Sequence, residues 1–322
     1  MFASPQTRRW LRFGLRRLAN AVIVLAALIV VTFLMVRLIP GDPAARIAGP
    51  DAAPDYVQSL RVELGLDRPL PAQFLSYFGN ALRGDFGRSY VSGEPVSQMI
   101  AQRLPFTLSL AVLALAIVLV VGFGLGLGCA IATQNNRNRW LDQTFTAVTG
   151  VTGALPEVIA GTVLVYLFAV QLQWLPISGA RAGWTSFVLP ALAIALRPSL
   201  NLARVVRVES ANALGQDYMR AAVSKRLGRR LTYLRHLLPN VMTGALTMAG
   251  ILFSFLVGGA VVVENIFAWP GLGTAVVRAV ISGDYPVVQG VILLLGLLVI
   301  LINTLVDVAL GLTDPRSLIG ES

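Results

Sequence analysis

The sequence predicts an all-α polytopic membrane protein with six transmembrane helices. Of its 322 residues, 56% are hydrophobic and only 13% are charged, a more apolar balance than a soluble domain shows. Long apolar runs alternate with arginine-rich polar segments, so the net charge of +10 is a topology signal. Because no soluble face is available to present that charge, nucleic acid is not an expected partner. Cys129 is the single cysteine, which excludes a disulfide or a cysteine metal cluster within the chain.

The first segment predicts a cytoplasmic N-terminus over residues 1–20 and a transmembrane helix over 21–39. Arginines without acidic neighbours precede the apolar run Ala21–Val36. A secretory signal peptide begins in the same way. The apolar run is long, however, and RLIPGD follows it rather than a small-residue cleavage site. This pattern favours a retained first span.

Residues 40–104 form the largest polar segment and are predicted to be an extracytoplasmic lobe, because acidic residues slightly outnumber arginines there. Val57–Leu66 is expected to be a short helix that Pro69 and Pro71 stop. Two interpretations remain open. The segment either caps the helix bundle or provides a docking surface for an external partner.

Residues 105–312 are predicted to be the membrane core, with five further transmembrane helices. A short re-entrant or interfacial helix is expected at Thr274–Ile281, and a cytoplasmic tail at 313–322, so both termini lie in the cytoplasm. The first of the five spans contains alternate glycines that permit close helix packing, and two pairs of them have GxxxG spacing: Gly122 with Gly126, and Gly124 with Gly128. The predicted spans are Phe106–Thr133, Asp142–Val170, Thr185–Val206, Val241–Val263 and Pro286–Leu312.

Two charged residues, Glu157 and Arg197, lie farther from the ends of these spans than any other charged residue. Pro156 interrupts the second of the five, and Glu157 follows it directly. An acid at that depth is costly and usually faces a cavity or a partner. Glu157 therefore either lines a translocation pathway or pairs with an arginine of another subunit. Arg197 either extends its guanidinium to the inner membrane boundary or lines the same pathway.

The loop at 207–238 is the most basic long segment between two predicted spans, which places it in the cytoplasm. Met219, Ala222 and Val223 share one face of a helix predicted within Gly215–Lys225. An apolar face of this kind suits a groove on another protein. The alternative is an amphipathic helix that lies on lipid headgroups. The basic residues of the region are Arg204, Arg207, Arg220, Lys225, Arg226, Arg229, Arg230 and Arg235.

Catalytic motifs are absent from the sequence. Lys225, the only lysine, follows Ser224 rather than a glycine, so there is no nucleotide-binding P-loop. His236 is the only histidine, which rules out a two-histidine metalloprotease site. There is also no GxSxG nucleophile motif. We therefore expect the chain not to be an enzyme and to carry no cofactor or metal of its own.

The basic loop resembles the cytoplasmic EAA loop of ABC importer permeases. Ala221 and Ala222 match the two alanines of that motif, and Leu238 and Pro239 match its closing Leu-Pro. Further segments are similar to the B-type permeases of peptide and nickel importers, and together they cover nearly the whole chain. They are RLIPGDP, LGLDRPL, RGDFGRS, GQDYMRAA, LRHLLPN, GGAVVVENIFAWPGLG, DYPVVQG and LVDVALGLTDPR.

The resemblance implies a type I ABC importer permease fold and a permease subunit of a bacterial inner-membrane importer. Di- or oligopeptides are the expected substrate, with nickel or another small solute as the alternative. The implied partners are a second, C-type permease, two ATPase subunits that bind ATP and Mg, an extracytoplasmic solute-binding protein and membrane lipid.

The same resemblance implies that the 215–239 loop transmits closure of the ATPases. Arg226 occupies the position of the family's glycine, and Arg220 that of its leading glutamate, so Gly228 is expected to provide the turn. The coupling residues implied are Gln216, Asp217, Tyr218, Met219, Arg220, Ala221, Ala222, Val223, Gly228, Leu238 and Pro239.

Two other functions compete with this one. A self-sufficient secondary carrier would need charges along the membrane midplane or inverted repeats with broken helices. Glu157 and Arg197 are the only candidate charges, and no convincing repeat is present. The other is a membrane scaffold that transports nothing, which stable association with ATPase subunits would contradict.

Overall fold

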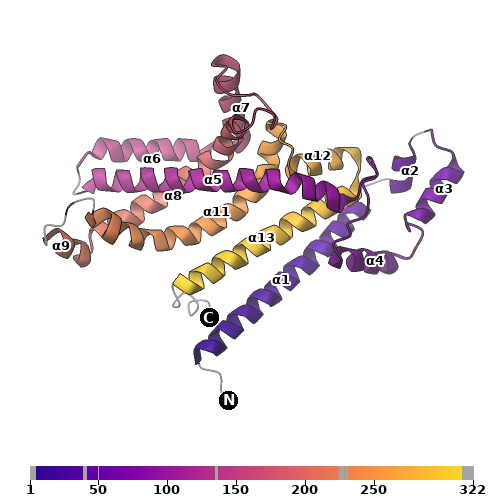
Figure 1. The fold of residues 1–322 in the computed structure, drawn as a ribbon, viewed down its shortest axis with the longest axis horizontal. Coiled ribbons are helices and arrows are strands. Elements are labelled where there is room, and N and C mark those ends of the chain that lie inside the picture. The colour runs from indigo at the N-terminus through magenta and orange to yellow at the C-terminus, as the bar shows by residue number, and fades with distance from the viewer. Residues whose placement is uncertain are drawn as a thin grey trace. The chain divides into compact units, whose positions relative to one another are not determined.

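The computed structural model describes residues 5–38, 42–49, 51–134, 137–224, 228 and 231–313. Figure 1 shows these residues as helices joined by turns. The one β-pairing among them is an isolated bridge between Arg88 and Pro95. The predicted all-α class is therefore confirmed for the described part of the chain. The chain divides into two compact units, which are described separately below.

The first unit comprises Met1–Phe106 and Pro270–Leu301. Its long N-terminal helix, α1 (Pro5–Leu38), packs against α4 (Leu70–Leu82). The ring of Phe33 lies 5.3 Å from that of Phe74 and 6.0 Å from that of Tyr77. The hydroxyl groups of Thr32 and Tyr77 are hydrogen-bonded at 3.1 Å. Aromatic packing and this polar contact thus fix the polar segment to the end of α1.

Prolines begin the short helices of the polar segment rather than end them. α2 (Pro43–Ala48), α3 (Pro54–Glu63) and α4 each have a proline within their first turn. We expected Pro69 and Pro71 only to stop a helix, and the sequence analysis missed α4. A proline is tolerated in the first turn, where its missing N–H would have had no helical acceptor.

A buried carboxylate anchors the turn that follows α4. Asp284, 4% exposed, lies between α12 (Leu272–Ser282) and α13 (Tyr285–Thr313). It accepts hydrogen bonds from the hydroxyl of Ser89 and from the backbone N–H of Tyr90, the latter at 3.0 Å. α1 and α13 lie side by side (Figure 1), and the side chain of Gln289 donates to the Thr32 carbonyl at 3.1 Å.

The second unit comprises Thr107–Trp269 and Ile302–Ser322, and α8 (Thr185–Leu214) forms its centre. α8 packs against α6, α7 and α11, and its Leu189, Ile194 and Leu202 are at most 1% exposed. The other helices of the unit are α5 (Val96–Ala132, whose first residues belong to the first unit), α6 (Arg139–Ala154), α7 (Glu157–Leu164), the π-helical η2 (Val165–Gln171), α9 (Asp217–Ser224), the π-helical η3 (Thr232–Leu237) and α11 (Leu238–Ile266).

Two of the four alternate glycines make the close helix contact. A Cβ on Gly126 would lie 2.5 Å from the carbonyl oxygen of Ala203 in α8, and one on Gly122 would lie 2.8 Å from the side chain of Leu202. Gly124 and Gly128 would meet nothing within 4 Å. Both pairs have the GxxxG spacing, but only the first faces α8.

Four helical segments within the described residues are long and apolar enough to cross a membrane: Gly14–Met35, Val96–Ala132, Thr185–Leu214 and Tyr285–Val306. The bent pair formed by α6 and α7–η2 would add a fifth. α11, predicted as a span, is a single helix of 29 residues, of which Gly250–Ile266 is a shorter apolar stretch. The count of six spans therefore stays a prediction.

Candidate functional site

The predicted coupling loop, residues 215–239, contains a separate short helix. α8 ends at Leu214, and the backbone N–H groups of Gly215 and Gln216 donate to the carbonyls of Asn212 and Ala213 at 3.2 and 3.1 Å. These bonds satisfy carbonyls that the end of α8 would otherwise leave without partners. α9 then begins at Asp217, whose acidic side chain suits the positive end of a helix.

The apolar side of α9 is buried within the chain. Met219 is 2% and Ala222 5% exposed, and α9 packs against η3 and α8. These two residues, which we expected in the groove of another protein, instead attach α9 to its own unit. The residues left open are Gln216, Asp217, Tyr218 and Ser224, with Tyr218 40% exposed. The side chains of Arg220, Ala221 and Val223, and the whole of Arg226, lie outside the described residues.

The second half of the loop leads directly into α11. The carbonyl of Gly228 accepts hydrogen bonds from the N–H and the hydroxyl of Thr232, at 3.0 and 3.2 Å. η3 follows and ends at the buried Leu237. Leu238 is half-buried and Pro239 is exposed in the first turn of α11, where proline is tolerated. The closing Leu-Pro of the motif therefore begins a helix.

Glu157 lies where the path of the chain bends by 100° between α6 and α7. Pro156 takes an extended conformation there, and Glu157 is the first residue of α7. The carboxylate is half-buried and lies against Gly259 of α11, where a Cβ would be 3.1 Å from its Oε2. The exposed Arg197 of α8 is close enough to act electrostatically on it. The structure thus brings the two predicted pathway charges into one region.

A second buried acid was missed by the sequence analysis. Glu264 is fully buried near the end of α11, and its Oε1 accepts a hydrogen bond from the hydroxyl of Thr107 in α5 at 2.6 Å. We had placed Glu264 in the connection after the predicted span Val241–Val263. The available sequence signal was that the acid directly follows three valines. In the structure α11 continues past it to Ile266.

Charged residues also pair at the end of α8 that precedes the loop. Arg207 forms an ion pair with Asp142 of α6, and its guanidinium lies 5.8 Å from the centre of the Phe145 ring. This contact joins α6 to α8 close to the start of the 215–239 loop.

Comparison with known families gives two matches that together cover most of the chain. Residues 122–318 match a family described as "Binding-protein-dependent transport system inner membrane component". Residues 10–111 match the N-terminal membrane component of the same transport systems.

Curated relatives match over nearly their full length. A putative peptide transport system permease protein of Brucella suis biovar 1 (strain 1330) is 41% identical over 309 residues, which cover 94% of this chain and 97% of the relative. The glutathione transport system permease protein GsiC of Escherichia coli (strain K12) is 40% identical over 307 residues, which cover 95% and 98% of the two chains.

Among solved structures, an inward-facing conformation of the MetNI methionine ABC transporter matches with a TM-score of 0.59 and 20% sequence identity. The match covers 69% of this chain and 99% of that one. At this level of identity the likeness establishes the fold alone, and that fold is the one of an ABC importer permease.

Proposed function

The chain belongs to the family of binding-protein-dependent transport system inner membrane components, and from this membership we propose that it is the permease subunit of an importer of di- and oligopeptides. The observation that carries the substrate class is the 41% identity, over 94% of the chain, to a protein named as a putative peptide transport permease. Uptake of labelled di- and tripeptides, with and without the chain, tests the substrate. Strong competition by nickel, with none by peptides, would instead favour the nickel alternative.

We further propose that the termini and the 215–239 loop lie in the cytoplasm and that the polar segment predicted at 40–104 lies outside. The part of it that precedes α5 is called the 42–95 segment below. The supporting observation is the concentration of arginine around the loop, because short cytoplasmic connections carry an excess of basic residues. Outside the membrane, the 42–95 segment would meet a solute-binding protein. If the 42–95 segment only caps the helix bundle, substitutions on its exposed face should leave stimulation of transport by the solute-binding protein unchanged.

Single cysteines test this topology. On a background with Cys129→Ala, Ser92→Cys and Ser224→Cys place a thiol at an exposed position of the 42–95 segment and of the loop, respectively. A membrane-impermeant maleimide should label the first in intact cells and the second only after the membrane is opened. Labelling in the reverse order would contradict the proposed orientation.

Coupling is proposed to pass through the exposed edge of α9. The proposed partners include two ATPase subunits, which bind ATP and Mg, and one of them would contact Gln216, Asp217 and Tyr218. Because Met219 and Ala222 are buried against the rest of the unit, a displacement of α9 is transmitted to α8 rather than absorbed by a loose loop. α8 is a continuous helix of 30 residues at the centre of its unit. Together with a second permease, it would then change the side to which the pathway opens.

A matched pair of substitutions tests this contact. Tyr218→Asp places a charge on the exposed edge of α9, whereas Tyr56→Asp makes the same change on an exposed tyrosine of α3. The first should reduce co-purification of the ATPases and peptide uptake at least about tenfold, the size of effect expected when an aromatic residue is lost from the centre of an interface. The second should leave co-purification unchanged. Equal co-purification by both variants would remove α9 as the contact.

Glu157 and Arg197 are proposed to line the pathway and to bind the charged ends of a peptide. Glu157 suits the amino terminus, since a half-buried carboxylate attracts a cation. Glu157→Gln should then slow uptake of peptides with a free amino terminus more than uptake of N-acetylated peptides. Arg197→Gln should slow uptake of peptides with a free carboxyl terminus more than uptake of peptides with an amidated carboxyl terminus. If Glu157→Gln lowers thermal stability without changing this preference, the carboxylate pairs structurally with another subunit instead.

A further inference from the structure

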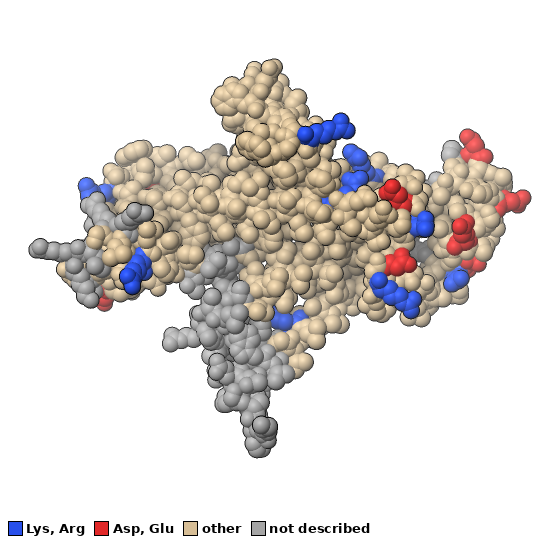
Figure 2. Space-filling view, viewed as in Figure 1, with Lys and Arg blue, Asp and Glu red and all other residues tan. Residues whose placement is uncertain are grey.

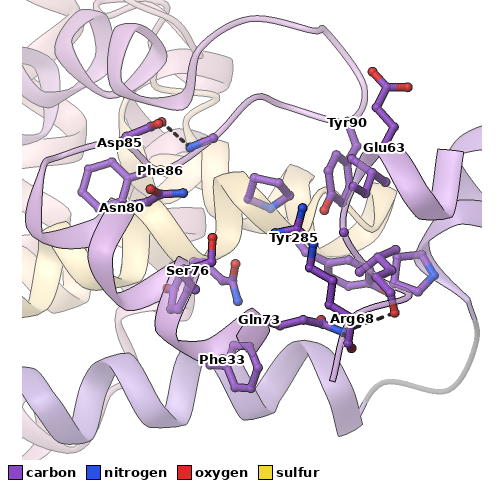
Figure 3. Close-up of a pocket in the computed structure, with 18 residues that line it drawn as sticks. Phe33, Glu63, Arg68, Gln73, Ser76, Asn80, Asp85, Phe86, Tyr90 and Tyr285 are labelled. Atoms are coloured by element: carbon purple, nitrogen blue, oxygen red, sulfur yellow. Dashed lines mark hydrogen bonds between the residues drawn. The ribbon is translucent and has the colours of Figure 1, made fainter. Parts of the chain in front are cut away.

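A basic cavity lies at the end of the second unit that precedes the 215–239 loop. It has a volume of about 490 Å³ and is formed where α5 ends, α6 begins and α8 ends. Three of its lining residues are arginines, namely Arg137, Arg139 and Arg207, and Asp142 is the one acid among them. Figure 2 shows basic side chains at this end of the unit, next to the tan surface of the helices. The cavity therefore has an excess of positive charge.

That charge is only partly neutralised within the chain. Asp142 pairs with Arg207, but the Nε of Arg207 is buried without a hydrogen-bond partner. Arg137 and Arg139 form no ion pair with any residue that the structure describes. The two arginines without an ion-pair partner therefore leave the cavity with positive charge that an anionic ligand would neutralise.

The start of α6 adds further donors at the same place. Asn138, which precedes the helix, makes no capping hydrogen bond with its side-chain oxygen, and its Nδ2 donates to the Ala132 carbonyl at 3.1 Å. Within the described chain, the backbone N–H of Arg139, which lines the cavity, also has no acceptor. A helix of 16 residues directs a partial positive charge toward this end. Guanidinium groups together with free backbone N–H groups are the donors that bind a phosphate group.

An exposed apolar stripe indicates where such a phosphate comes from. Trp140, Val148 and Val151 of α6 are 65%, 52% and 69% exposed, and their spacing places them on one face of the helix. The stripe begins next to the cavity with a tryptophan, a residue enriched at the level of lipid headgroups. A phospholipid could thus lay an acyl chain along the stripe while its phosphate enters the cavity, which a free phosphate ion could not do.

We propose that this cavity binds the headgroup of an anionic phospholipid, with Arg137, Arg139 and Arg207 as phosphate ligands and the Trp140 face of α6 as the surface for the acyl chain. Basic pockets between helices on the cytoplasmic side are suited to anionic headgroups. Leu214 and Gly215 also line the cavity, so the lipid contacts the end of α8 directly before the 215–239 loop. The lipid is then a structural ligand that stabilises the end of α8, where the 215–239 loop begins, and not a transported solute.

Quenching of Trp140 fluorescence tests the proposal on the full-length chain in vesicles. The vesicles contain phosphatidylglycerol or phosphatidylcholine that is brominated near the glycerol end of its acyl chains. Subtraction of the Trp140→Phe spectrum isolates the signal of Trp140 from those of the other tryptophans. We expect preferential quenching by phosphatidylglycerol. Arg137→Gln with Arg139→Gln should lower that preference at least about fivefold, since one basic residue near an anionic surface contributes about that factor.

The control variant, Arg83→Gln with Arg181→Gln, removes two exposed arginines that do not line the cavity and should keep the full preference. Arg137→Lys with Arg139→Lys keeps the charge and should retain most of the preference for phosphatidylglycerol. This variant separates loss of the phosphate ligands from loss of folding.

Three outcomes would overturn the proposal. The first is equal quenching of the unmodified chain by both lipids. The second is an equal loss of preference in the control variant. The third is loss of the preference on addition of millimolar inorganic phosphate at constant ionic strength, which would identify a phosphate site rather than a lipid site.

Discussion

The contact between α5 and α8 gives the sharpest prediction, because one helix carries both the test position and its control. A Cβ at Gly126 would lie 2.5 Å from the Ala203 carbonyl oxygen and 2.8 Å from the Cβ of Val206. Non-bonded contacts of a Cβ below 3.0 Å essentially do not occur, and a backbone carbonyl in the middle of a helix cannot turn away. Gly126→Ala must therefore separate the two helices by about 0.5 Å, the difference between the 3.0 Å limit and the 2.5 Å distance to the Ala203 carbonyl oxygen.

The cost of that separation follows from the behaviour of tightly packed cores. Forcing an additional carbon into such a contact typically costs about 1–3 kcal/mol. At Gly124, by contrast, an added Cβ meets nothing within 4 Å, and alanine is favoured over glycine within a helix by roughly 1 kcal/mol. The two single substitutions should therefore differ by about 2–4 kcal/mol in the free energy of unfolding. Gly122→Ala should fall between them, because it meets the side chain of Leu202 rather than a carbonyl.

Thermal unfolding of the purified chain in one detergent, followed by intrinsic fluorescence, measures this difference. For a chain of this size, about 1 kcal/mol corresponds to roughly 2–4 °C in the unfolding midpoint. Gly126→Ala should thus unfold at least about 4 °C below Gly124→Ala, with Gly122→Ala between them. Identical midpoints for Gly126→Ala and Gly124→Ala would refute the close approach of α5 and α8.

Three further predictions concern polar contacts. The Arg61 side chain lowers the pKa of Asp42, so this pair stabilises α2 and α3 above about pH 4 and less as the pH falls below it. Because both side chains are partly exposed, the pair contributes less than about 1 kcal/mol to stability. Amide hydrogen exchange of α2, corrected for intrinsic rates, should therefore show a loss of protection in acid. Asp42→Asn should abolish this pH dependence. Asp284→Ala leaves the Ser89 hydroxyl without its acceptor and should cost about 2–4 kcal/mol of stability. Limited proteolysis should then cut the turn after α4 faster. Unchanged cleavage would contradict the anchor. Glu264→Leu removes a buried acid together with its hydrogen bond and should destabilise the chain less than Glu264→Ala, which also opens a cavity. Equal unfolding midpoints for the two variants would count against the buried position of Glu264.

The regular helices were predictable because apolar periodicity and length determine them. α8, α11 and α13 each include the predicted span, and α12 (Leu272–Ser282) contains the short helix expected at Thr274–Ile281. α4 was not predicted, because prolines at the start of a helix look the same as prolines that end one. The sequence also did not distinguish the two glycine pairs of α5, since that choice depends on where α8 packs.

A helix in the 215–239 loop was predictable, but the direction of its apolar face was not. An apolar face on α9 suits a partner's groove and the chain's own core equally well, so only the packed structure shows that Met219 and Ala222 face inward. Glu264 was missed for a related reason. Its burial depends on Thr107, which is 157 residues away along the chain and supplies the hydrogen bond that makes a buried acid tolerable.

The anchor at Asp284 has a consequence for biogenesis. Ser89 and its acceptor are 195 residues apart, so the turn after α4 leaves the ribosome long before the group that holds it. At about 5–20 residues per second, the interval is on the order of 10–40 seconds. Throughout that time the nascent turn lacks the Asp284 acceptor, and a chain truncated before residue 284 never acquires it. The anchor of this turn therefore forms only after most of the chain has been synthesised.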